Sequence, residues 1–136
     1  MKGDPQNMQD KPHYQDLLLE VREFLKERIL TCKNNGINSD RLIIDIGFGF
    51  GKTPSANLRL INNLDYFREI GLPVMVGVSR KSTIKKICDD QLSGSLAAAL
   101  FAIKNGAKIL RVHDVKETVS ALKVWESISK ECLVEW

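Results

Sequence analysis

Three short apolar runs, rich in β-branched residues, recur along this chain with helical segments between them. The runs begin near Leu42, Val74 and Lys108, so roughly thirty residues separate each from the next, the length of one βα unit. Strands that are apolar on both faces and alternate with helices indicate a parallel sheet covered by helices. The sequence therefore predicts an α/β fold in the order α-β-α-β-α-β-α, with three parallel strands and four helices.

The expected helices follow from apolar residues at helical spacing. They cover residues 12–35, 57–67 and 92–104, and a last segment with Val119, Leu122, Trp125 and Ile128 on one side. A glycine follows each of the first three: Gly36, Gly71 and Gly106. Glycine at this place is typical of a helix C-terminus, so these boundaries are well marked.

Composition excludes several classes of protein. The 136 residues are 43% apolar and 27% charged, which is typical of a globular chain and not of a disordered one. The net charge of +3 includes no basic run, so we expect no nucleic-acid partner. No apolar run could span a bilayer, the N-terminus does not resemble a signal peptide, and the three cysteines lie far apart. We expect residues 1–136 to form one portion of a single domain, cytoplasmic and without a membrane partner.

Unusual polar residues follow each expected strand. Asp45 precedes the glycine-rich stretch 47–52, and the stretches 79–82 (SRKS) and 111–114 (RVHD) follow the second and third strands. The carboxyl ends of parallel strands meet on one face, where barrels and open sheets build their sites. Three strands cannot close a barrel of eight, so the chain is either a small open sheet or the last part of a barrel. Its first residues, which read like a loop leaving an absent strand, favour the barrel.

The stretch 47–53 (GFGFGKT) matches neither common phosphate-binding pattern. A Walker A loop would need glycine where Ile46 stands, and the GxGxxG pattern lacks its third glycine. A flexible turn is one interpretation. We favour a ligand loop, because glycines permit tight backbone geometry while Phe48 and Phe50 can present flat apolar surface to a ring.

The charged residues at the strand ends have ordinary and functional interpretations. Asp45 is either a turn-capping carboxylate or the acceptor for an amidine-like edge. Ser82 could begin a helix and favour an anion there. Arg111 and His113 alternate and so share one side of the strand; they form either part of a surface His–Asp pair or an anion site. With two histidines in the chain, a histidine-rich metal site is not supported.

Together these motifs resemble the dihydropteroate synthase family. The family pattern Asp-Pro-Gly-x-Gly-Phe-Gly-Lys appears as residues 45–52, with Ile46 in place of proline. Further matches are Asn57-Leu58, Gly77–Ser82, Gly94–Ala99, Arg111–Val115 and Met1–Gln9. The resemblance implies the C-terminal part of a (β/α)8 TIM barrel, and the condensation of 6-hydroxymethyl-7,8-dihydropterin pyrophosphate with p-aminobenzoate.

The resemblance also assigns roles to single residues. It makes Lys81, Arg111 and His113 catalytic, and gives substrate contacts to these three and to Asp45, Phe50, Gly77, Ser82 and Met1. Asp45 and Lys81 would hold the polar edge of the pterin, and Arg111 would lie against its ring in a pocket lined by Met1 and Gly77. Phe50 and Ser82 would contact p-aminobenzoate, and Arg111 with His113 would bind the departing pyrophosphate.

The resemblance further implies a Mg²⁺ ion, a homodimer through the late helices and a sulfonamide target. The Mg²⁺ ligand belongs to the first half of the family's barrel, which this sequence lacks, so we expect no metal ligand in this chain and no activity from it alone. Two alternatives stay open from the sequence. One is a pterin-binding domain of the corrinoid methyltransferase type, and the other is a catalytically incomplete remnant.

Overall fold

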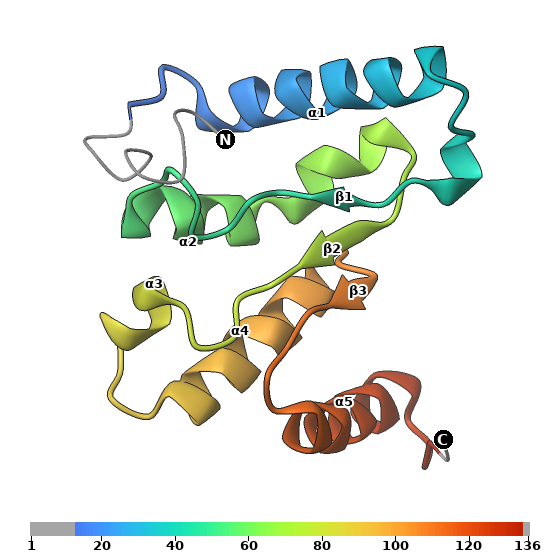
Figure 1. Ribbon diagram of the computed structural model, residues 1–136. Helices are drawn as coiled ribbons and strands as arrows, with labels where there is room; N and C mark the ends of the chain where they lie inside the picture. The colour runs from blue at the N-terminus through green and yellow to red at the C-terminus, as the bar shows by residue number, and fades with distance from the viewer. Residues whose placement is uncertain (1–12, 135–136) are drawn as a thin grey trace.

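A three-stranded parallel sheet forms the centre of the molecule (Figure 1). The computed structural model describes residues 13–134, so Met1 lies outside the described part. Strands β1 (Ile44–Asp45), β2 (Val74–Val76) and β3 (Ile109–Leu110) lie side by side in chain order. The expected parallel sheet is confirmed, although its strands are shorter than the apolar runs that predicted them. The register sets Met75 beside Ile109 and Val76 beside Leu110.

In the described part of the chain, five α-helices lie around this sheet, not the expected four. They are α1 (Leu17–Asn34), α2 (Pro54–Asn62), α3 (Ser82–Lys85), α4 (Gln91–Lys104) and α5 (Val115–Lys130), and two 3₁₀ helices cover Ser39–Arg41 and Leu64–Ile70. The prediction of one helix over 57–67 is wrong, because Asn63 leaves the helical conformation and its side chain donates to the Arg59 carbonyl at 2.7 Å. The single turn α3 is the additional element.

Capping side chains explain where the helices begin. Asp16 accepts hydrogen bonds from the backbone N–H groups of Leu18 and Leu19, so α1 begins at Leu17 and not at residue 12. Thr53 caps α2 in the same way, with Pro54 at its first position, and Asp90 caps α4. Gly36 follows α1 with a φ of +83°, as expected of a glycine after a helix C-terminus.

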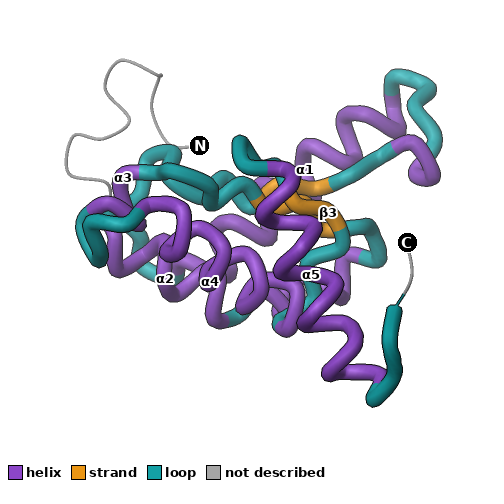
Figure 2. The backbone as a smooth tube through the Cα atoms, turned by 90° about the horizontal axis from the view of Figure 1, so that it is seen from below, coloured by secondary structure: helices purple, strands orange, loops and turns teal. Residues whose placement is uncertain are grey.

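The core lies where the sheet meets the helices around it. Its buried side chains come from α1, from the segments of β1 and β2, from α2 with the 3₁₀ helix after it, from α4 and from the residue before β3: Leu17, Val21, Leu25, Ile44, Ile46, Phe48, Val74, Val76, Val78, Leu60, Ile61, Leu64, Phe67, Ala99, Ala102 and Ala107. Helices α2, α4 and α5 follow one another in contact (Figure 2). Helices therefore cover the sheet, and the segments that follow the three parallel strands lie at one end of it.

Two apolar segments are only partly covered. Strand β3 is half-buried, whereas Ile44 of β1 and Val74 and Val76 of β2 are buried. Ile128 is 72% exposed, although Val119, Leu122 and Trp125 on the same helix are half-buried. The late part of α5 therefore leaves apolar surface uncovered.

No helix in residues 13–134 is both long enough and apolar enough to cross a bilayer. Cys32, Cys88 and Cys132 carry free thiols.

Candidate functional site

The polar clusters after the three strands come together at one end of the sheet. Lys81, after β2, reaches the glycine loop after β1, and its ammonium is influenced by the charges of both Asp45 and Arg111. Gly77, directly after β2, lies against the side chain of Arg111, which directly follows β3. The expectation that the three clusters meet is confirmed, because parallel strands deliver their carboxyl ends to a common edge.

The loop after β1 depends on its three glycines. Gly47, Gly49 and Gly51 have φ angles of +69°, +81° and +58°, in the left-handed region that other residues rarely adopt. The chain therefore folds back on itself between the two aromatic residues. Phe48 is 1% exposed and belongs to the core, whereas Phe50 is 40% exposed. Of these two rings only that of Phe50 is accessible, so the expectation of a surface for a ligand ring is wrong for Phe48.

Lys81 lies across this loop. A Cβ atom at Gly49 would come within 2.9 Å of the Lys81 side chain, so glycine is what lets the lysine pass. The Lys81 ammonium donates to the Phe48 carbonyl and sits 4.6 Å from the centre of the Phe50 ring. Burial lowers the pKa of Lys81, the Asp45 carboxylate raises it in part, and Arg111 lowers it further.

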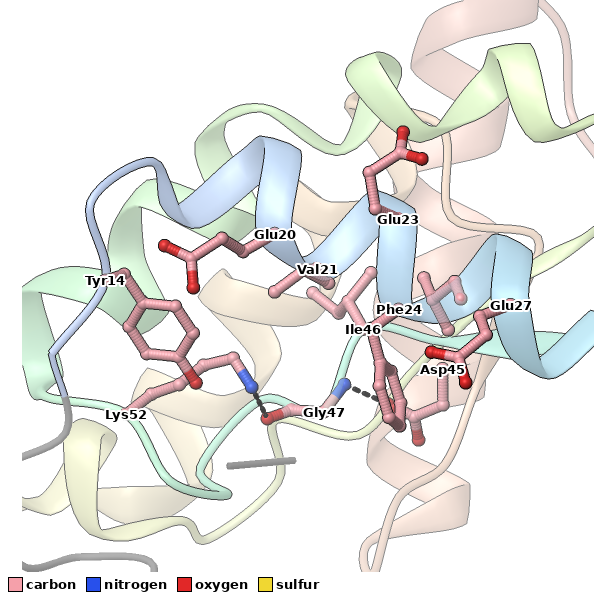
Figure 3. A pocket seen from close by; sticks show the side chains of 11 residues that line it. Tyr14, Glu20, Val21, Glu23, Phe24, Glu27, Asp45, Ile46, Gly47 and Lys52 are labelled. Carbon is pink, nitrogen blue, oxygen red and sulfur yellow. Dashed lines mark hydrogen bonds between the residues drawn. The ribbon is translucent and has the colours of Figure 1, made fainter. Parts of the chain in front are cut away.

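Lys52 closes the same loop from inside. Its ammonium donates to the Gly47 carbonyl at 2.9 Å (Figure 3). It also donates to the Phe50 carbonyl at 3.0 Å, and the residue is only 6% exposed. Burial lowers the pKa of Lys52 to about 8, against the raising effect of Asp45. Sequence reasoning missed this role. The available signal was a lysine next to a glycine turn, whose carbonyls lack strand partners and need donors.

A buried side-chain pair ties the loop to the next polar cluster. Asn57 of α2 accepts from the Gly49 backbone N–H at 2.8 Å and donates to the Thr83 hydroxyl at 2.9 Å. Asn57 is 2% exposed and Thr83 is 1% exposed. This bridge therefore sets the distance between the glycine loop and α3, and Thr83 was not among the expected site residues.

Asp45 holds the turn after β1, which is one of the two interpretations of this carboxylate, and it can still accept further hydrogen bonds. One carboxylate oxygen accepts from the Gly47 N–H at 2.7 Å, which holds the turn (Figure 3). The residue is exposed, and its second oxygen has no hydrogen-bond partner within residues 13–134. Ile46, in place of the family's proline, is 1% exposed and packs in the core.

Continuing the β2–β3 register places two further pairs side by side. Arg111 lies beside Gly77, where a Cβ atom would come 3.3 Å from the guanidinium Nε. His113 lies beside Ser79, with its Nδ1 3.0 Å from the serine hydroxyl. Arg111 and His113 therefore both face the carboxyl end of β2, as their alternation predicts.

Asp114 does not pair with His113. It accepts instead from the Arg80 guanidinium through both carboxylate oxygens, with Nε to Oδ2 at 3.0 Å. This contact lowers the pKa of Asp114. The simple alternative of a surface His–Asp pair is therefore wrong, and His113 is left to other partners.

Ser82 lies apart from these pairs. It begins α3, is exposed, and lines a hollow of about 360 Å³ together with Gly49, Lys52 and Lys86. The structure thus places Ser82 next to the glycine loop.

A second hollow, of about 440 Å³, lies between α1 and β1 (Figure 3). Tyr14, Phe24, Asp45 and Lys52 are in its wall, whereas Lys81, Arg111 and His113 are not. It is therefore not the place where the three clusters meet. Within residues 13–134, no group of three or more His, Cys, Asp or Glu side chains could hold a metal ion.

Comparison with known proteins identifies the family that this chain resembles in sequence and in structure. A family described as "Pterin binding enzyme" matches residues 1–113. Dihydropteroate synthase of Haemophilus influenzae is 47% identical over 131 residues, which are 93% of this chain and 48% of that protein. The crystal structure of the Yersinia pestis dihydropteroate synthase with a sulfonamide drug is 39% identical, with a TM-score of 0.92, and the match covers 96% of this chain and 49% of the other.

A third comparison is with the Xanthomonas albilineans dihydropteroate synthase in complex with 7,8-dihydropteroate. It is 45% identical, with a TM-score of 0.84, over 87% of this chain and 48% of that one. The chain thus spans about half the length of the relatives it matches. Its strands and helices form a partial (β/α)8 TIM barrel. The match over residues 1–113 and the shared fold show that this chain belongs to the pterin binding enzyme family.

Proposed function

We propose that this chain supplies the pterin and leaving-group side of a dihydropteroate synthase. That reaction joins p-aminobenzoate to 6-hydroxymethyl-7,8-dihydropterin pyrophosphate. The observation that carries the proposal is the meeting of Asp45, Lys81 and Arg111 at one end of the sheet. The named relatives support it, since they are dihydropteroate synthases and one was solved with 7,8-dihydropteroate.

The pterin lies over this charged group. Its N–H and amino groups donate one to each carboxylate oxygen of Asp45, a planar bidentate arrangement in which one oxygen also keeps its hydrogen bond from the Gly47 N–H. Lys81 donates to the same polar edge from the other direction. Arg111 lies flat against the ring, because Gly77 leaves no Cβ atom to displace it, and Met1 is proposed to line the same pocket.

The reaction needs no nucleophile from the protein. The amine of p-aminobenzoate forms a bond to the pterin methylene carbon, and the bond from that carbon to the pyrophosphate oxygen breaks. Phe50 and Ser82 hold the p-aminobenzoate, using the exposed ring and the exposed hydroxyl respectively. Arg111 and His113 bind the pyrophosphate, so they stabilise negative charge as it develops on the leaving oxygen.

Four further features of the activity stay proposals. A Mg²⁺ ion is proposed to accompany the pyrophosphate, with its protein ligand in the first half of the family's barrel, and no step is assigned to it. Exposed Val124 and Ile128 on α5 support a homodimer. The free thiols support a cytoplasmic location. The Yersinia pestis complex with a sulfonamide drug supports sulfonamide sensitivity of the complete enzyme.

Ligand titration tests the proposal directly. The purified chain is expected to bind 6-hydroxymethyl-7,8-dihydropterin pyrophosphate, and Asp45→Asn to weaken that binding. Asp40→Asn, at an exposed carboxylate of the 3₁₀ helix Ser39–Arg41, serves as the control and should leave binding unchanged. A folded chain that binds no pterin, or that loses affinity equally in both variants, contradicts the proposal.

Turnover is a separate measurement. Labelled p-aminobenzoate should not be incorporated by this chain alone, since elements of the family's active site lie outside it. Incorporation that disappears in Lys81→Ala would support the function and overturn the expected dependence on those elements.

A further inference from the structure

Ser79 is a buried serine in direct contact with an expected site residue. It follows β2, is 4% exposed, and lies beside His113 through the continued strand register. Its hydroxyl oxygen is 3.3 Å from the His113 backbone nitrogen and 3.0 Å from the ring nitrogen Nδ1. Both contacts come from a single residue across the strand pair, so they fix the ring relative to β2.

The number of hydrogens decides the direction of the second contact. A serine hydroxyl has one hydrogen to donate and two lone pairs that accept. The His113 backbone N–H is a donor only, so it takes one lone pair of the Ser79 oxygen. If Nδ1 also carried a hydrogen, the buried hydroxyl hydrogen would have no acceptor among the hydrogen bonds of residues 13–134, which is costly.

We propose that Ser79 is a positioning residue that donates to Nδ1 of His113 and so holds the neutral imidazole with its hydrogen on Nε2. In neutral histidine one ring nitrogen is a donor and the other an acceptor, and the partner of one decides the state of the other. His113 is exposed, and Nε2 has no hydrogen-bond partner within residues 13–134. The ring therefore offers an N–H group to whatever binds at the carboxyl ends of β2 and β3.

The position of the imidazole hydrogen determines whether His113 can donate to an anion. An Nε2–H group donates to a phosphate oxygen, whereas an Nε2 lone pair would repel it. Arg111, two residues earlier, adds a guanidinium on the same side. The binding of pyrophosphate by His113 rests on the proposed function, but the tautomer that Ser79 selects does not.

Nuclear magnetic resonance of the imidazole nitrogens tests the proposal in the complete chain. His13→Gln leaves His113 as the single histidine, and the spectra are recorded at alkaline pH. The expected spectrum shows a protonated Nε2 and an unprotonated, hydrogen-bonded Nδ1. In Ser79→Ala the Nδ1–H form should appear as an additional fraction, and the affinity for inorganic pyrophosphate should fall on the order of fivefold.

Ser95→Ala is the matched control. Ser95 is 5% exposed and its hydroxyl accepts from the Arg80 backbone N–H, so the variant removes a hydroxyl of similar burial next to the same loop without touching His113. Its His113 nitrogen signals should be those of the parent. A protonated Nδ1 in the parent chain overturns the proposal by itself. A Ser79→Ala spectrum that is the same as that of the parent also overturns it.

This experiment distinguishes the role of Ser79 from the proposed anion site. A protonated Nε2 together with no pyrophosphate binding would contradict the anion site of the proposed function, while the assignment of Ser79 would be confirmed.

Discussion

The ammonium of Lys81 lies 4.6 Å from the centre of the exposed Phe50 ring, and it donates to the carbonyl of the buried Phe48. One cation from the end of β2 thus holds the loop that follows β1. Gly49 makes the contact possible, since a Cβ atom there would come 2.9 Å from the Lys81 side chain. The proposed pterin and p-aminobenzoate positions therefore depend on each other through this lysine.

Lys81→Ala should weaken binding of the pterin pyrophosphate by roughly thirtyfold, about 2 kcal/mol, because a charge-assisted hydrogen bond and the loop contact are lost together. Titration calorimetry on the purified chain measures this. Lys85→Ala removes another lysine, four residues later at an exposed position of α3, and as the control it should bind as the parent does. Equal losses in both variants would show that only overall charge matters.

Gly77→Ala should displace Arg111, because the new Cβ atom would come 3.3 Å from its Nε. We expect the affinity for pterin pyrophosphate to fall about tenfold with little change in thermal stability. A double-mutant cycle checks the cause. Gly77→Ala should have almost no further effect in an Arg111→Ala background, and a full additional loss there would contradict the mechanism.

Asn57→Ala should lower the free energy of unfolding by about 2 kcal/mol, because it removes the buried hydrogen bonds that Asn57 makes to the Gly49 N–H and the Thr83 hydroxyl. Urea denaturation measures the change. Asn62→Ala, at an exposed position of the same helix, is expected to alter stability by less than about 0.5 kcal/mol. A similar loss in the two variants would mean that the bridge contributes nothing beyond helix propensity.

Lys52 should make stability depend on pH in the alkaline range. Its pKa falls from the ordinary 10.5 to about 8 in the folded chain, so between these values the unfolded chain binds more protons. The free energy of unfolding should therefore rise with pH through this window, by roughly 2 kcal/mol relative to Lys52→Met. Parallel urea titrations at neutral and alkaline pH give the difference.

The control for that comparison is Lys104→Met, at an exposed position of α4. Its stability should follow the pH dependence of the parent. A parent and a Lys52→Met variant with parallel pH profiles would show that the buried ammonium is not linked to folding.

Local sequence was sufficient for much of the fold. Alternating helical and β-branched segments required a parallel α/β arrangement, since apolar strands of this kind must be covered on both faces. The glycines at 36 and 47–51 marked where the backbone turns, because they supply left-handed φ angles. The break at Asn63 was not visible, since the apolar pattern continues through Leu64 and Phe67 while the backbone changes to a 3₁₀ helix.

The sequence by itself determined which residues stand at the strand ends: Asp45, the glycine loop, Lys81, Arg111 and His113. Only the tertiary structure decided their partners. Asp114 pairs with Arg80 and leaves His113 to Ser79, and Lys52 turns inward to carbonyls while Lys81 crosses the loop. The physical reason is that strand order and register determine which side chains meet across the sheet. Strand order and register are not encoded within any one segment of the chain.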